Sequence, residues 1–151
     1  MKRALAAASL LAACSSGSPA PAVLDTKNDA CGWCRMAVSD PRSAGQIVAP
    51  AEEPKFFDDI GCLAHYVAGT KPLPPGAVVY VADHRTQAWV NADVAVFTAV
   101  PSLATPMDSH LIAHADAASR DTDPDAKGGT PRTAAEVFVA SLPNGPEEAQ
   151  K

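Results

Sequence analysis

Residues 55–68, KFFDDIGCLAHYVA, predict a short strand that passes directly into a helix. Phe56 and Phe57 would face opposite sides of that strand, because successive side chains alternate. The two aspartates that follow are suited to cap a helix over residues 60–68. Apolar side chains recur in this helix at the spacing of one buried face: Ile60, Leu63, Ala64 and Val67. Gly69 and the prolines behind it end the helix.

Further strands and helices are predicted on both sides of this unit. Residues 36–38 and 44–49 have the composition of short strands, and residues 77–83 indicate a strand buried on both faces. Thr133 and Glu136 form a capping-box pattern at the start of the last helix. The sequence signals after residue 83 are weaker. They predict short strands at 87–90, 95–97 and 111–113, a short helix at 116–120, a mobile loop at 121–129 and a helix at 133–142.

Two thiols and a thioether stand close together in residues 29–36, DACGWCRM. Cys31, Cys34 and Met36 offer soft donors, which suit Cu(I) far better than magnesium, calcium or manganese. A zinc site would leave the methionine unused, and so would a redox pair that uses both thiols. Trp33, between the thiols, would either shield a bound ion from water or pack the loop. From the motif alone, a metal site and a disulfide or redox pair both remain open.

The N-terminus predicts export. Residues 1–13 join a short positive start to an apolar run that is too short to span a bilayer, as in a signal peptide. Small residues directly before Cys14 look like a bacterial lipobox. This predicts a lipoprotein whose lipidated cysteine leads into a flexible tether over residues 14–28. The alternative is an ordinary secretory signal that is cleaved after Ala13 or a little later.

Export changes the meaning of the other cysteines. The chain has four, and lipid on Cys14 leaves Cys31, Cys34 and Cys62, an odd number. In an oxidising compartment an odd thiol indicates a metal ligand or a reactive group. A Cys31–Cys34 disulfide with a buried, free Cys62 is the alternative.

The composition sets the remaining limits. Fourteen prolines and 5% aromatic residues in 151 predict a thin, loop-rich core. The formal net charge is −5 and no basic, aromatic-laced segment occurs, which argues against nucleic acid as a partner. No Ser-His-Asp set, phosphate-binding glycine loop or catalytic carboxylate pair can be assembled, so we do not expect an enzyme. Residues 143–151 form a polar tail.

Four separated motifs together resemble the NosL family, the nitrous oxide reductase accessory lipoproteins that bind Cu(I) and deliver it outside the cytoplasm. The motifs are DACGWCRM at 29–36, AGQI at 44–47, FDDIGCL at 57–63, and TPM at 105–107 followed by Ile112 and Ala113. The resemblance covers about residues 29–120. It implies an α+β fold of two small, related β-β-α-β halves packed together, which would be residues 29–83 and 84–142.

The resemblance also implies a cuprous site. It favours Cys31 and Met36 as ligands, Cys34 as an additional or exchange ligand, and Met107 as the contribution of the second half. Cys62 is a further candidate, although its place beside the apolar stripe also fits a buried, inert thiol.

The histidines are weaker candidates. His110 lies three residues after Met107 and could complete the site. The others are expected to be surface or hydrogen-bonded residues: His65, His84 and His114. The sequence departs from the NosL pattern at Arg35 and at residues 108–110, where glycine is common in the family.

The function expected from these features is that of a lipid-anchored protein on the periplasmic face of a membrane. It would bind Cu(I) and pass it to a copper enzyme, with nitrous oxide reductase and other maturation factors as partners. One alternative is a thiol–disulfide oxidoreductase that uses Cys31 and Cys34, although Pro41 follows too soon for the long helix of a thioredoxin-like site. The other is a structural zinc lipoprotein that uses Cys31, Cys34, Cys62 and a histidine.

Overall fold

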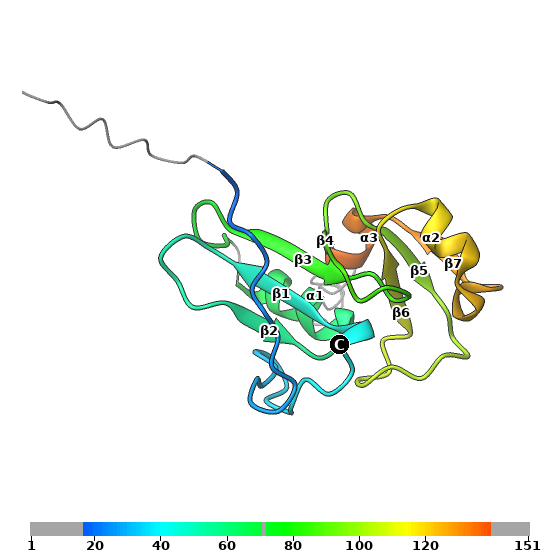
Figure 1. Cartoon of the computed structure of the whole chain (residues 1–151), viewed down its shortest axis with the longest axis horizontal. Coiled ribbons are helices and arrows are strands. Elements are labelled where there is room, and N and C mark those ends of the chain that lie inside the picture. The colour runs from blue at the N-terminus through cyan, green and yellow to red at the C-terminus, as the bar shows by residue number, and fades with distance from the viewer. Residues whose placement is uncertain (1–16, 71, 140–151) are drawn as a thin grey trace, which may run out of the picture.

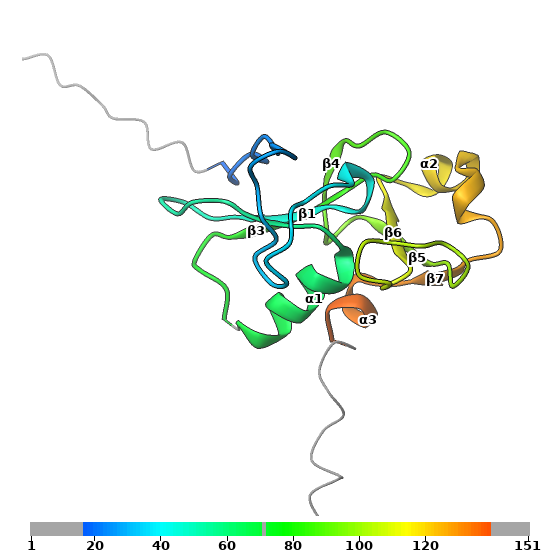
Figure 2. The same cartoon turned by 90° about the horizontal axis from the view of Figure 1, so that it is seen from below.

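The computed structural model describes residues 17–70 and 72–139, and one of its two sheets has four antiparallel strands (Figure 1). In spatial order these are β2 (Lys55–Phe57), β1 (Gly45–Val48), β3 (Val78–Ala82) and β4 (Trp89–Asn91). Helix α1 (Ile60–Gly69) covers one face of this sheet (Figure 2). Gly45 allows the close approach, because a Cβ atom there would lie 2.6 Å from Cδ2 of Leu63.

The predicted strand-to-helix unit is confirmed. Phe56 and Phe57 are both buried, and the four predicted stripe residues of α1 are buried as well. Asp59 is the N-cap of the helix, and its side chain accepts a hydrogen bond from the backbone N–H of Gly61 at 2.6 Å. Only one of the two consecutive aspartates is therefore used as a cap, which leaves Asp58 for another role.

The second sheet has three antiparallel strands in the order β6 (Leu111–His114), β5 (Val96–Ala99) and β7 (Thr130–Arg132). The remaining elements are the short helices η1 (Pro41–Ser43), α2 (Ala117–Thr122), η2 (Pro124–Ala126) and α3 (Ala134–Val139). Helix α3 lies beside α1 (Figure 2). Phe138 of α3 packs edge-to-face on Phe97 of β5, with ring centroids 5.8 Å apart. The predicted α+β class is confirmed.

Asp83 joins the two sheets at the end of β3. It forms an isolated bridge with Ala113 of β6, and its carboxylate accepts hydrogen bonds from the backbone N–H of Ala115 and the hydroxyl of Ser119. Burial disfavours the charged carboxylate, but these bonds and those from Thr86 outweigh burial and hold the pKa of Asp83 well below its ordinary value. The charged group thus fixes the start of α2 against the end of β3.

The structure differs from the sequence predictions in several places. Residues 36–38 form no strand, because the motif loop folds back on itself and leaves only an isolated bridge between Ala30 and Ala37. Strand β7 was not predicted. Residues 121–129 were predicted to be a mobile loop, but they contain η2, and Asp123 is buried.

The segment before the motif packs against the first sheet. The backbone N–H of Ala22 donates to Oε1 of Gln46 at 2.7 Å, and the hydroxyl of Tyr80 donates to the carbonyl of Pro19 at 2.6 Å. A flexible tether in this region would therefore end sooner than the predicted residue 28. Strand β3 was predicted to be buried on both faces, but its residues 78–80 are only half-buried.

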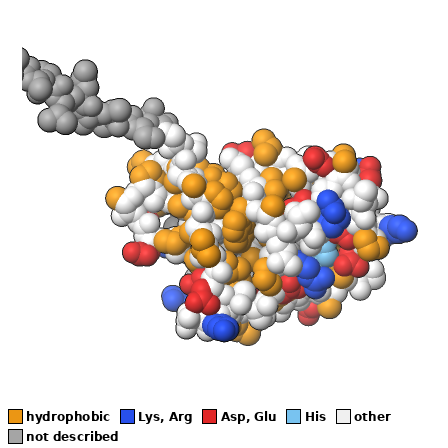
Figure 3. All heavy atoms as spheres, viewed as in Figure 1, with side chains coloured by type: hydrophobic (Ala, Val, Ile, Leu, Met, Phe, Trp, Pro, Cys, Tyr) orange, Lys and Arg blue, Asp and Glu red, His pale blue; other side chains and the backbone are white. Residues whose placement is uncertain are grey.

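The capping box of α3 is confirmed, since the backbone N–H of Thr133 donates to Glu136 and that of Glu136 donates to the Thr133 hydroxyl. The predicted end of this helix at residue 142 lies outside the described residues. Among the helices described, none has the length and hydrophobicity needed to cross a lipid bilayer. On the face shown in Figure 3, apolar side chains gather over β1 and β3, while charged ones gather on the side of α2.

Candidate metal centre

The motif loop is held in place by backbone hydrogen bonds. The N–H of Cys31 donates to the carbonyl of Met36 at 2.7 Å, and the N–H of Arg35 donates to the carbonyl of Cys31 at 3.1 Å. The N–H of Gly32 donates to the carbonyl of Phe56 at 2.8 Å and so ties the loop to β2. Both motif cysteines are therefore presented from a loop that is anchored on the first sheet.

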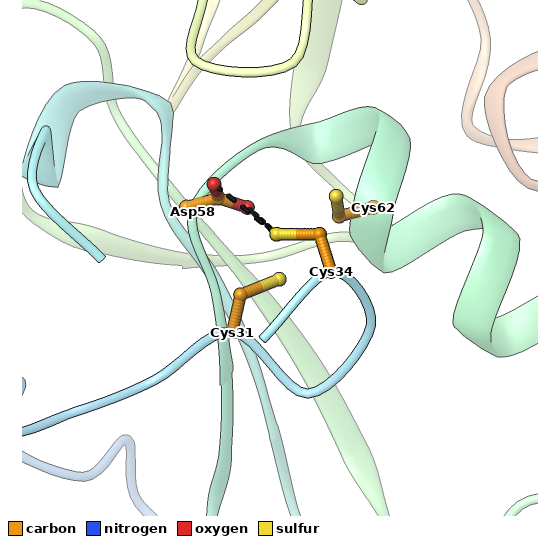
Figure 4. Close-up of side chains that lie close together, drawn as sticks. All are labelled: Cys31, Cys34, Asp58 and Cys62. Atoms are coloured by element: carbon orange, nitrogen blue, oxygen red, sulfur yellow. Dashed lines mark hydrogen bonds between the residues drawn. The ribbon is translucent and has the colours of Figure 1, made fainter. Parts of the chain in front are cut away.

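Three thiols and one carboxylate converge at this point (Figure 4). Cys31 and Cys34 come from the motif loop, Asp58 from the end of β2, and Cys62 from the first turn of α1. Their ligand atoms all lie within 4.8 Å of one another. Cys31, Asp58 and Cys62 are buried, whereas Cys34 is half-buried. The cluster thus has three covered donors and one that solvent can reach.

Asp58 is the member of the cluster that sequence reasoning missed. The thiol of Cys34 lies 3.5 Å from both of its carboxylate oxygens, within the range of a weak S–H donor. A pair of consecutive aspartates before a helix predicts a cap. Because one residue is enough for the cap, the second aspartate was the available hint of a different role.

The environment disfavours ionised thiols in the metal-free protein. Burial raises the pKa of Cys34, and the neighbouring Cys31 and Asp58 raise it further against a hydrogen bond from the backbone of Met36. Burial also raises the pKa of Cys62 far above its ordinary value, with contributions from Cys31 and Asp58. A metal ion bound here must therefore displace protons from sulfur.

The two predicted methionine ligands are exposed. Met36 is 48% exposed and Met107 is 42% exposed, so neither fills the core. The backbone N–H of Met107 donates to Oδ2 of Asp59 at 3.1 Å, which ties the second-half loop to the start of α1. A Cβ atom on Gly61 would lie only 2.7 Å from Cβ of Ser109, so the same loop packs tightly on that helix turn.

The predicted histidine lies outside the thiol cluster. Nδ1 of His110 is 2.8 Å from the carbonyl oxygen of Leu103, to which it donates as an N–H. His65 instead stacks on Trp33, with ring centroids 5.6 Å apart and an interplanar angle of 14°. Trp33 is half exposed, so its indole lies on the surface where the motif loop meets α1. Cys14, the predicted lipidation site, lies outside the described residues.

The chain matches the model of a known protein family. The model of the NosL family matches residues 22–141, which include the motif loop, both sheets and the loop that carries Met107. The chain belongs to the NosL family. A search of curated proteins and a search of solved structures found no match.

The residues predicted to depart from the NosL pattern include three with a left-handed backbone. Arg35 has a φ of 69°, Asp108 has 53° and His110 has 57°. Glycine adopts these conformations without strain, and other residues do so less readily. This NosL chain therefore has larger side chains at turns whose backbone conformation glycine would adopt without strain. These turns lie beside the motif cysteines and beside Met107.

Proposed function

We propose that this NosL-family protein binds one Cu(I) ion through Cys31, Cys34 and Cys62 and passes it to a copper enzyme outside the cytoplasm. The proposal rests on the convergence of three thiols from two elements of the fold. Thiolate is the soft ligand that selects Cu(I). Nitrous oxide reductase is the acceptor that the family implies, with other maturation factors as further partners. The protein acts as an accessory metal carrier and not as an enzyme.

The unequal burial of the thiols supports a transfer mechanism. Cys31 and Cys62 are buried and would hold the ion, while half-buried Cys34 is open to an incoming ligand. A ligand from the acceptor would replace Cys34 first, and the ion would pass through two- and three-coordinate intermediates. Low coordination keeps a position free for that exchange.

The exposed methionines extend the exchange path. Met36 ends the motif, and the loop of Met107 is tied to Asp59, the N-cap of the helix that carries Cys62. Neutral thioethers are soft but bind more weakly than thiolates, so they suit a weak additional contact. We propose that Met36 and Met107 make such contacts with the bound ion and assist it as it leaves the thiols. Trp33, which stacks over His65, would shield the ion from water and oxidant.

Zinc is the second candidate, and Asp58 is the observation that favours it. Three thiols and one carboxylate supply the four ligands of a tetrahedral zinc site. The predicted zinc site used a histidine as its fourth ligand, whereas the cluster has an aspartate there. Membership of the NosL family favours copper.

A thiol–disulfide oxidoreductase is disfavoured by the environment of the thiols. Such an enzyme needs a thiol with a lowered pKa, as found where a Cys-X-X-Cys pair opens a helix. Here the pKa of Cys34 is raised by burial, and the motif lies in a loop. The half-buried thiol is therefore a poor nucleophile at neutral pH.

Metal competition tests the proposed function. Reduced protein, purified without oxygen, is expected to bind one Cu(I) per chain and to keep it against excess Zn(II). The measurement is competition with a Cu(I) chelator, followed by metal analysis. Asp58→Asn should weaken Zn(II) binding by about tenfold or more and Cu(I) binding much less, because zinc uses the carboxylate as a ligand. Displacement of Cu(I) from the wild type by excess Zn(II) would contradict the copper assignment, whereas Zn(II) bound in addition to Cu(I) would not.

The membrane anchor is a separate proposal that rests on Cys14 and the residues before it. Wild-type protein is expected to fractionate with membranes and to carry lipid on Cys14 by mass spectrometry. Cys14→Ala should not mature normally and should leave the lipidated fraction, whereas Cys62→Ala should remain anchored. An exported wild-type product without lipid would rule out the anchor.

The chain order of the elements suggests that the two sheets are related halves, as the resemblance implied. In the first, β1, β2, α1 and β3 follow one another, and β1 lies between β2 and β3. In the second, β5, β6, α2 and β7 follow one another, and β5 lies between β6 and β7. We propose that one β-β-α-β unit was used twice, with the thiol cluster built in the first unit alone.

A further inference from the structure

A second cluster of ligand-type side chains lies at the junction of the two sheets. It consists of His84, His114 and Asp123, which are 4%, 0% and 4% exposed. Nδ1 of His84 lies 2.8 Å and Nε2 of His114 lies 2.9 Å from the same atom, Oδ2 of Asp123. Both histidines were expected to be surface or hydrogen-bonded residues, and they are buried and hydrogen-bonded.

Each member of this cluster is held by ordered backbone. His84 follows β3, and its N–H donates to the carbonyl of Ala113 in β6 at 2.8 Å. His114 is the last residue of β6. The other oxygen of Asp123 accepts the N–H of Asp125 at 3.0 Å, which caps η2 and leaves Oδ2 facing the two imidazoles. The three side chains are therefore held in position before any metal ion binds.

Asp123 supplies the one carboxylate of the cluster. Burial disfavours the charged form of Asp123, but hydrogen bonds from His114, His84 and the N–H of Asp125 outweigh burial and lower its pKa. The charge of Arg42 acts on Asp123, but Arg42 is itself paired with Asp40 at 3.0 Å. A bound cation would compensate the buried carboxylate.

As a purely structural network the cluster is incomplete. Nδ1 of His114 is buried and has no hydrogen-bond partner among the described residues. An ion at Nε2 would not satisfy this nitrogen, so the metal site is supported by the convergence of the three ligand atoms and not by the unpartnered Nδ1. A set of three polar residues that is buried and only partly satisfied is an unfavourable way to join two sheets.

We propose that His84, His114 and Asp123 form a second metal site, for a divalent first-row cation such as Zn(II). Two imidazole nitrogens and a carboxylate suit such a cation, whereas Cu(I) prefers the thiols of the other cluster. The ion would replace the two N–H donors, whose ring protons move to the opposite nitrogens. Ligands around tetrahedral zinc lie roughly 3.3 Å apart, given bonds of about 2.0–2.1 Å, so the cluster would open by roughly half an ångström.

An open pocket of about 390 Å³ borders this site. Asp123 forms part of its wall, together with Thr98, Arg120, Asp121 and Lys127. Solvent therefore comes close to the residue that carries the carboxylate, while the imidazoles are covered. With an ion on Nε2, the ring proton of His114 would lie on Nδ1, which has no protein partner among the described residues. Binding of the ion by His114 must therefore be measured directly.

The side-chain nitrogen signals of the histidines provide that readout. Full-length reduced protein, labelled with 15N, is titrated with Zn(II) to more than two equivalents so that the thiol cluster is saturated as well. The expected result is a shift of the ring nitrogens of His84 and His114 to the metal-bound pattern, while His110, whose Nδ1 donates to the carbonyl of Leu103, provides the internal control. Unchanged signals of His84 and His114 at saturation would overturn the proposal and leave a hydrogen-bonded triad.

Calorimetric measurement of zinc binding by two matched variants tests the proposal independently. Asp123→Asn keeps the shape of the side chain and should weaken the second zinc site by about tenfold or more. Asp125→Asn, on the same turn, should bind as the wild type does. Equal zinc stoichiometry and affinity in the wild type and in folded Asp123→Asn would also overturn the proposal. If Asp123→Asn does not fold, the titration of the wild type still decides.

Discussion

Serine in place of Cys31 or Cys62 is expected to lower Cu(I) affinity by about 100-fold or more. Loss of an outer-shell partner alone lowers metal affinity by about 10- to 100-fold, and here a thiolate ligand is replaced by a hard, neutral hydroxyl. Both positions are buried, so the hydroxyl should also lower the free energy of unfolding by about 1–3 kcal/mol. Competition with a Cu(I) chelator measures the affinity, and urea unfolding of the metal-free protein measures the stability.

The methionines provide the matched comparison. Met36→Leu and Met107→Leu keep size and apolarity at exposed positions, so stability should change by less than about 0.5 kcal/mol. Cu(I) affinity should fall in both, on the order of tenfold, if the thioethers assist the site. Wild-type affinity in both methionine variants would confine the metal to the thiols. Wild-type affinity in Cys31→Ser would contradict the thiol site itself.

Most of the first sheet and its helix could be predicted from the sequence because their signals are local. The apolar stripe of α1 and its capping aspartate lie within ten residues of each other in sequence, and β1 and β3 are short apolar runs. Strand β7 was missed because its sequence is Thr-Pro-Arg and all of it is exposed. An edge strand with no buried side chain has no hydrophobic pattern to detect.

The candidate sites were less predictable because they depend on contacts between distant residues. An odd number of cysteines hinted at Cys62, but only the fold brings α1 against the motif loop. Asp58 resembled a cap, and the capping signal hid its contact with Cys34. His84 and Asp123 are 39 residues apart, and the glycine and charges around Asp123 indicated a loop with no buried residue. Tertiary burial overrode the local composition there.

The affinity for Cu(I) is expected to rise steeply with pH, because binding releases thiol protons. The pKa values of Cys34 and Cys62 are raised, chiefly by burial, so the metal-free protein holds both protons through neutral pH. Cu(I) must release them, and each released proton makes the apparent affinity rise about tenfold per pH unit. The stability of the metal-free fold depends on pH in the opposite direction, falling as pH rises. A raised thiol pKa favours the folded state below the unfolded value of about 8.5, and this contribution is lost as pH rises further.

Apparent Cu(I) affinity is therefore expected to rise by at least about 100-fold per pH unit across the neutral range, if both thiols bind as thiolates. Chelator competition at several pH values, corrected for protonation of the chelator, measures this slope. Cys62→Ser and Cys34→Ser should each lower the slope by about one proton. Met36→Leu should leave it unchanged even where affinity falls, because a thioether carries no proton. A flat profile in the wild type would mean that the ion binds without displacing thiol protons, and the three-thiolate site would have to be abandoned.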